Sequence, residues 1–173
     1  NPGMHNDWLL CATRYNRPIR KHPQDEFMTH TLTATDINSI IASGLPGARG
    51  WGFMVEDVSA EGVVCRVRYS DKQLRPGGTL SGPTMMALAD AAMYAAVLAR
   101  LGRLEMAVTQ NLNINFLSRP EPADLIAKAE VLKLGRRTVV MDVKIFSEGR
   151  LEPVAHATGT YSLPPRNSSS PSA

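Results

Sequence analysis

This 173-residue chain has two cysteines, a small net charge and a single long apolar run. Each of these shortages argues against one kind of protein. The two cysteines, Cys11 and Cys65, lie far apart and lack metal-ligand spacing, so we expect free thiols in a reducing compartment. The net charge of +3 comes from scattered basic residues, few of them beside aromatics, which gives no sign of a nucleic-acid partner. Because we see no secretory signal and only one long apolar run, we expect a soluble, cytoplasmic protein with no membrane partner.

Sequence motifs for several kinds of catalytic site are missing as well. No His and Glu residues are paired at the spacing of a zinc site, so no metal site is expected. The chain also has no glycine-rich phosphate loop and no order of Ser, His and Asp typical of a hydrolase triad. Its length fits one domain with enough apolar content to bury a substantial core.

A run rich in Ala, Met and Leu in the middle of the chain predicts a helix over 83–101. Ser81 or Gly82 can cap its start, and Pro83 suits the first turn, where a missing N–H costs nothing. Gly102 lies just past the end, where glycine commonly stops a helix. Since the run is apolar on nearly every side, we predict a helix enclosed by protein rather than one on the surface.

Asp90 is the only ionisable residue between Pro83 and Ala99, and its neighbours one helical turn away are mostly apolar. A charge placed there without partners would cost free energy or be neutralised. The carboxylate therefore has either a structural role, accepting hydrogen bonds at a subunit contact, or a functional role. Together with the surrounding strand patterns, this charge favours a buried central helix over a membrane-spanning one.

The rest of the folded chain reads as one short helix and six strands. The short helix covers 35–44, with Thr35 as its cap and one apolar stripe. The predicted strands cover 51–58, 62–69, 108–117, 123–133, 138–147 and 154–163. A loop over 71–80 leads into the long helix. This order is α+β, and the simplest geometry is a curved antiparallel sheet wrapped around one long central helix.

The two ends of the chain differ in composition from this domain. Residues 1–30 have neither helical nor strand periodicity, so we predict an irregular N-terminal extension. Residues 166–173 form a Ser, Pro and Asn tail that we predict to be disordered. The domain itself is expected to span 31–165.

The start of the long helix carries a family resemblance. Leu88-Ala89-Asp90 and Gly82 match the central helix of hotdog-fold proteins, in which a His-Gly-Gly-like turn precedes a Leu-Ala-Asp segment. Ser81 stands where that family usually has His, and Pro83 stands where it has a second Gly. Over roughly residues 40–163 the chain resembles the hotdog fold and, within it, the acyl-CoA thioesterases of the phenylacetic-acid-degradation type. The run 113–120 is similar to the end of a strand in the same family.

The resemblance implies an acyl-CoA thioesterase that releases a carboxylic acid and free CoA, with no cofactor besides the CoA of the substrate. It also implies that the Gly82 N–H polarises the thioester carbonyl and that Asp90 acts as base or nucleophile. The helix rise places these two residues about 12 Å apart, too far for one chain to bring both to one carbonyl carbon. Two antiparallel helices at a two-fold interface remove this difficulty, which predicts a homodimer or a dimer of dimers.

Five further residues are candidates for contact with the substrate, each with a simpler alternative. Tyr94, one turn from Asp90, could orient that carboxylate or contact the substrate, or could only pack its ring. Ser81 and Thr84 could contact the substrate or cap the helix. Asn113 and Asn115 share a polar strand face that could line the acyl pocket or face solvent.

A second group, Arg136, Arg137 and Thr138, lies on a predicted hairpin where the family often meets CoA phosphates. Adjacent exposed arginines are also commonly just solvated. Two other functions stay open at this point. One is a non-catalytic hotdog module that binds acyl thioesters or apolar acids, and the weaker one is a hydratase of the same fold, whose Asp-to-His spacing is missing from this helix.

Overall fold

The computed structural model describes residues 32–44 and 50–165, so Cys11, the whole predicted extension over 1–30 and the predicted tail lie outside the described residues. The helices described over their full length are α2 (Ala34–Gly44) and α4 (Gly82–Leu101), and a short 3-10 turn covers Asp71–Gln73. The strands of the main sheet are β1 (Phe53–Val58), β2 (Val63–Val67), β5 (Val108–Phe116), β6 (Leu125–Leu134), β7 (Thr138–Ser147) and β8 (Ala155–Ser162). A small separate hairpin consists of β3 (Leu74–Arg75) and β4 (Thr79–Leu80).

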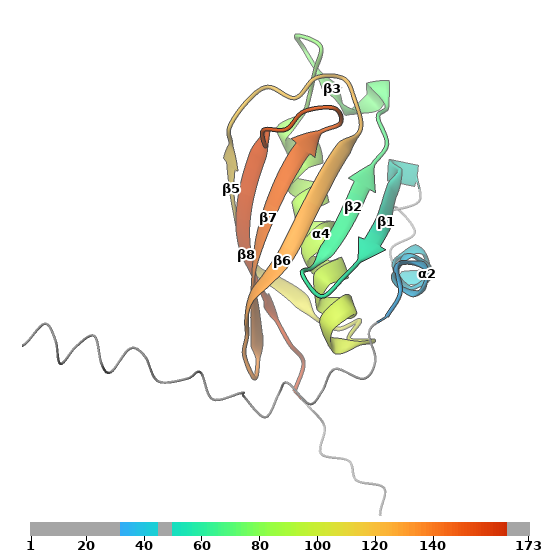
Figure 1. Ribbon diagram of the computed structural model, residues 1–173, viewed down its shortest axis with the longest axis vertical. Helices are drawn as coiled ribbons and strands as arrows, with labels where there is room; N and C mark the ends of the chain where they lie inside the picture. The colour runs from blue at the N-terminus through green and yellow to red at the C-terminus, as the bar shows by residue number, and fades with distance from the viewer. Residues whose placement is uncertain (1–31, 45–49, 166–173) are drawn as a thin grey trace, which may run out of the picture.

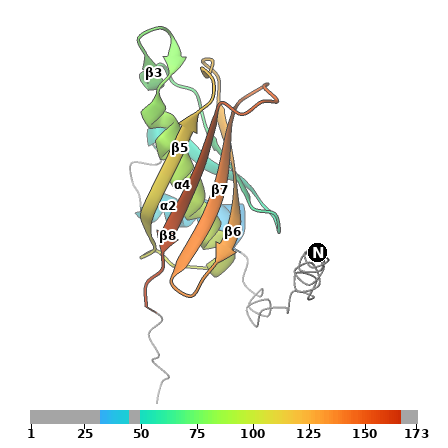
Figure 2. The same ribbon diagram turned by 90° about the vertical axis from the view of Figure 1, so that its left-hand side faces the viewer.

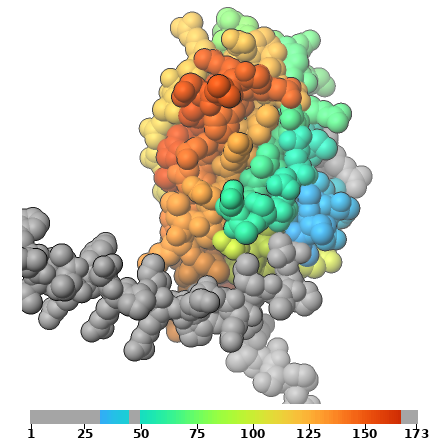
Figure 3. Space-filling model, viewed as in Figure 1, coloured from blue at the N-terminus to red at the C-terminus, as the bar shows by residue number. Residues whose placement is uncertain are grey.

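The six long strands form one antiparallel sheet in the order β1-β2-β6-β7-β8-β5, and α4 lies along its inner face (Figure 1). In the space-filling view α4 is almost hidden behind the strands (Figure 3). The prediction of a curved antiparallel sheet around one long helix is therefore confirmed. The predicted loop over 71–80 is wrong in part, because it contains the 3-10 turn and the hairpin of β3 and β4.

The long helix α4 begins and ends with the expected signals. The Ser81 side chain accepts a hydrogen bond from the Thr84 N–H, and the Gly102 N–H donates to the Leu98 carbonyl. Gly102 has a φ of +78°, a conformation that glycine adopts without strain. Although α4 is long and apolar enough by composition to span a bilayer, most of it is buried inside this fold. Its exposed side includes Met86, which is 43% exposed.

The short helix α2 packs beside β1, which is an edge strand of the sheet. Its cap is Thr33 rather than the predicted Thr35, because Thr33 and Asp36 exchange hydrogen bonds between their side chains and backbone N–H groups. Asn38 bonds both backbone groups of Val55 on β1, at 2.8 Å each, so α2 occupies what would be an open sheet edge. The buried stripe predicted for this helix is confirmed: Ile37, Ile40 and Ile41.

The opposite edge of the sheet is β5, and most of its residues are exposed. Figure 2 shows it beside β8, with its other side unpaired among the described residues. The pairing shifts between Thr109 and Asn111, which leaves Gln110 as an extra residue in a β-bulge. The bulge keeps Thr109 on the same face as Leu112 and Ile114, toward α4.

Candidate active site

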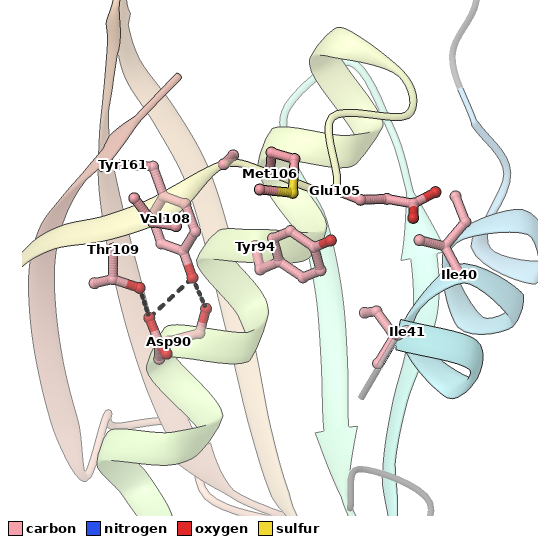
Figure 4. Close-up of a pocket in the computed structure, with 11 residues that line it drawn as sticks. Ile40, Ile41, Asp90, Tyr94, Glu105, Met106, Val108, Thr109 and Tyr161 are labelled. Atoms are coloured by element: carbon pink, nitrogen blue, oxygen red, sulfur yellow. Dashed lines mark hydrogen bonds between the residues drawn. The ribbon is translucent and has the colours of Figure 1, made fainter. Parts of the chain in front are cut away.

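Asp90 lies half-buried on α4 and has two hydroxyl partners from the sheet (Figure 4). The Thr109 hydroxyl donates to Asp90 Oδ1 at 2.6 Å. The Tyr161 hydroxyl lies 2.9 Å from the same oxygen and 3.1 Å from the Asp90 backbone carbonyl. The sequence placed this carboxylate among apolar helix neighbours, and the polar partners come instead from β5 and β8.

Tyr161 is a protonated donor in this arrangement. Burial is the largest cause that raises the pKa of its hydroxyl, the Asp90 carboxylate raises it further, and the hydrogen bond with Thr109 lowers it. The Tyr161 ring is stacked on Tyr94, with 6.3 Å between the ring centroids. Tyr94 therefore packs against Tyr161, and it is Tyr161 that bonds the Asp90 carboxylate.

A cavity of about 470 Å³ opens beside these residues, between α4, α2 and the segment that leads into β5. Apolar walls come from Ile40 and Ile41 on α2 and from residues 106–108. Asp90 and Glu105 are the charged groups that line it, and no Lys or Arg is among the lining residues. The Tyr94 ring lies between these two carboxylates (Figure 4). The cavity can therefore hold a mainly apolar group next to a carboxylate.

Gly82 is the first residue of α4 and lies outside this cavity. The N–H groups of Thr84 and Met85 are directed to the Ser81 side chain and carbonyl, and Pro83 has none. Within residues 32–44 and 50–165, the Gly82 N–H has no such acceptor, so it is the free donor at the positive end of the helix. In one chain, Gly82 and Asp90 therefore do not both line this cavity.

The other candidate residues fall into separate places. Ser81 and Thr84 bond each other at 2.9 Å in the helix cap, and Tyr94 lines the cavity. Asn113 and Asn115 are exposed along β5, where their side-chain amides lie 3.5 Å apart, and neither lines the cavity.

Arg136 and Arg137 are exposed in the turn between β6 and β7, and Thr138 starts β7. This turn lies at the end of the molecule where α4 has its C-terminus, whereas Gly82 is at the N-terminus of α4, at the opposite end (Figure 1). Within one chain these three residues are therefore separated from the helix start.

Sequence reasoning missed Thr109 and Tyr161. A signal for Tyr161 was present, because the alternation over 154–163 places this residue on the inward face, where a buried tyrosine hydroxyl needs a partner. Thr109 had no comparable signal, because a strict alternation along β5 turns it outward and only the bulge returns it to the inner face.

Comparison with known proteins agrees with this geometry. The family model described as the thioesterase superfamily matches residues 77–154. A candidate thioesterase from Silicibacter sp. TM1040 is 40% identical with a TM-score of 0.72, and the match covers 80% of this chain and 96% of that chain. A point mutant of the phenylacetic acid degradation protein PaaI from Thermus thermophilus is 28% identical with a TM-score of 0.61, covering 69% of this chain and 99% of that chain.

A more distant structure, thioesterase HI1161 from Haemophilus influenzae, is 20% identical with a TM-score of 0.70, covering 78% of this chain and 92% of that one. At this identity the match bears on the fold alone. No protein with a curated description matches the chain. The 40% identity over nearly the whole of a related chain, with the family match across the start of α4 and Asp90, shows that this chain belongs to the thioesterase superfamily and is a hotdog-fold thioester hydrolase.

Proposed function

We propose that the protein hydrolyses acyl-CoA thioesters to a carboxylic acid and free CoA, with Asp90 as base or nucleophile and the Gly82 N–H of the partner subunit polarising the carbonyl. One observation carries the assignment of Asp90: its carboxylate borders a mainly apolar cavity, and both side-chain hydrogen bonds go to one oxygen. Among the described residues the other oxygen, Oδ2, has no partner and is available for chemistry.

In the base route, Asp90 takes a proton from water while the water oxygen bonds to the thioester carbonyl carbon. The negative charge that develops on the carbonyl oxygen is stabilised by the N–H at the start of α4. The C–S bond then breaks, and the proton is delivered to the thiolate, which leaves as CoA. In the nucleophile route, Oδ2 bonds to the carbonyl carbon, the thiolate leaves, and water hydrolyses the resulting anhydride.

The way β5 runs along α4 supports the proposed homodimer. At its start, Thr109 contacts Asp90, and at its end Phe116 lies against Gly82. If the free edge of β5 pairs antiparallel with the same strand of a second copy, the Thr109 end of one strand meets the Phe116 end of the other. Asp90 of one chain then comes next to Gly82 of the partner subunit, and the symmetry generates two equal sites.

The same symmetry supports a role for the turn between β6 and β7 in CoA binding. In one chain, Arg136 and Arg137 lie at the end of the molecule away from Gly82 (Figure 1). Because the two α4 helices would run antiparallel, this end is the one that Gly82 of the partner subunit approaches. Exposed guanidinium groups there suit the phosphates of a CoA whose thioester reaches the shared site.

The substitution Asp90→Asn tests this function, because it keeps the shape of the side chain and removes the base. We expect kcat for acyl-CoA, measured by thiol release, to fall by about two to four orders of magnitude while KM stays within a few-fold. Asp142→Asn is the matched control, since Asp142 is a half-buried carboxylate bonded to His156 on β8, away from the cavity. If Asp90→Asn hydrolyses acyl-CoA at the wild-type rate and melts at a much lower temperature, Asp90 is structural and the proposal is wrong.

A further inference from the structure

Thr109 and Tyr161 place both of their side-chain hydrogen bonds on the same carboxylate oxygen, Asp90 Oδ1. We propose that these two residues are positioning residues: they fix Oδ1 and leave Oδ2 as the oxygen that reacts. This inference rests on the proposed function of Asp90. It assigns a role to two strand residues that do not belong to the long helix.

The two hydroxyls are held by the sheet itself. Thr109 and Tyr161 are direct partners across the β5–β8 pair, so the backbone ladder sets their separation. Tyr161 is also 3.1 Å from the Asp90 carbonyl and stacks on Tyr94, which restrains its ring in two further ways. An aspartate side chain has two rotatable bonds, and donors fixed on one oxygen restrict both of them. The orientation of Oδ2 is thus determined before any substrate arrives.

The described residues of the cavity lining offer Asp90 hydroxyl donors and no positively charged partner. The other charged residue of the lining is Glu105, which is ion-paired with Arg103 outside the lining. The lining residues of α2 are Ile40, Ile41 and Gly44, which have no side-chain donor. Among the described lining residues, the hydroxyls of Thr109 and Tyr161 are therefore the groups that orient the Asp90 carboxylate.

The experiment removes each hydroxyl while keeping the shape of the side chain, with Tyr161→Phe and Thr109→Val. We expect each change to lower kcat about tenfold with KM nearly unchanged, because the donor acts on the reacting group and not on substrate binding. A change that acted only on folding would not separate kcat from KM in this way. Thr109→Ser keeps the hydroxyl and should restore kcat.

Tyr69→Phe is the matched control, because Tyr69 donates the same kind of hydrogen bond to Asp71 at 2.6 Å, on the surface away from the cavity. It should leave kcat unchanged. If Tyr161→Phe and Thr109→Val lower only the melting temperature and leave kcat at the wild-type value, the hydroxyls are structural and this inference is wrong.

The two proposals fail in different ways. An active Asp90→Asn variant overturns the proposed function together with this inference. An inactive Asp90→Asn combined with wild-type kcat in both hydroxyl variants overturns the positioning role alone. Should Tyr161→Phe fail to fold, the comparison of Thr109→Val with Thr109→Ser decides the question, because Thr109 is an exposed edge-strand residue.

Discussion

Phe116 lies against Gly82, so that the last residue of β5 covers the first residue of α4. A Cβ atom added at Gly82 would stand 3.3 Å from Phe116 Cζ, tighter than ordinary van der Waals contact. The glycine therefore matters for the position of the ring as well as for access to its own N–H. A side chain added at Gly82 would therefore displace the Phe116 ring, which lies on β5 at the free edge of the sheet.

The first prediction concerns this contact. We expect Gly82→Ala to lower kcat for acyl-CoA by about one to two orders of magnitude, because the methyl group displaces Phe116 and crowds the carbonyl beside the N–H. The melting temperature should change little, since the neighbouring ring is half exposed. Gly50→Ala is the control, because nothing lies within 4 Å of a Cβ added there. An unchanged kcat in Gly82→Ala would remove the N–H of this residue from the mechanism.

The second prediction concerns the sheet edge. We expect Asn113→Lys to weaken the proposed dimer, because lysine near the middle of β5 would place two like charges close together where the two strands would pair. Thr158→Lys is the control: Thr158 is the direct partner of Asn113 on β8, one strand away from the edge. Light scattering at several concentrations measures the oligomeric state, and kcat should fall as the Asn113→Lys protein dissociates. A fully active monomer at assay concentration would contradict the shared site.

The third prediction concerns the charge of the acyl group. Because Asp90 and Glu105 line the cavity without a lining cation, acyl-CoAs whose acyl group ends in a carboxylate should be poor substrates. We expect Glu105→Gln to raise kcat/KM for such a substrate by a few-fold and to leave a neutral acyl group of equal length unaffected, since Glu105 is partly solvated. Equal kcat/KM for the charged and neutral acyl groups in the wild-type protein would show that the cavity is not the acyl site.

The fourth prediction concerns Cys65, which is fully buried on β2. Burial is the main cause that raises the pKa of its thiol, and the nearby Glu56 raises it further. The thiol therefore stays protonated through neutral pH, and both access and thiolate content oppose labelling. In a Cys11→Ser variant, an aromatic disulfide reagent should label Cys65 at the rate of unfolding and no faster. Rapid labelling in the folded protein at pH 8 would contradict this burial.

The fold could be predicted because its signals are local in the sequence. The predicted strand over 138–147 agrees with Thr138–Ser147, since Val139, Met141, Val143 and Ile145 place an apolar residue at every second position there. The predicted cap at Thr35 was wrong although a signal existed, since Thr33 is followed three residues later by Asp36. The hairpin of β3 and β4 was missed because strands of two residues have no periodicity to detect.

The candidate site was predictable only in part, for a different reason. Asp90 could be found from the sequence because it is a charged residue among apolar neighbours on the same helix. Its partners are 19 and 71 residues further along the chain, and no spacing rule connects a helix residue with two strand residues at those distances. The relation between Gly82 and Asp90 could be inferred from helix rise alone, because both lie on one regular element.

The bulge at Gln110 gives β5 one residue that the site does not need. Deleting Gln110 would leave a regular ladder in which Thr109 still pairs with Tyr161 and faces inward, because Asn111 and Leu112 then follow in strict alternation. Straightening the strand with Gln110 retained would instead turn Thr109 outward, and the carboxylate would lose one of its two donors. Among relatives of this chain, a gap aligned with Gln110 is therefore compatible with the same donor, and the residue aligned with Thr109 is the one to compare.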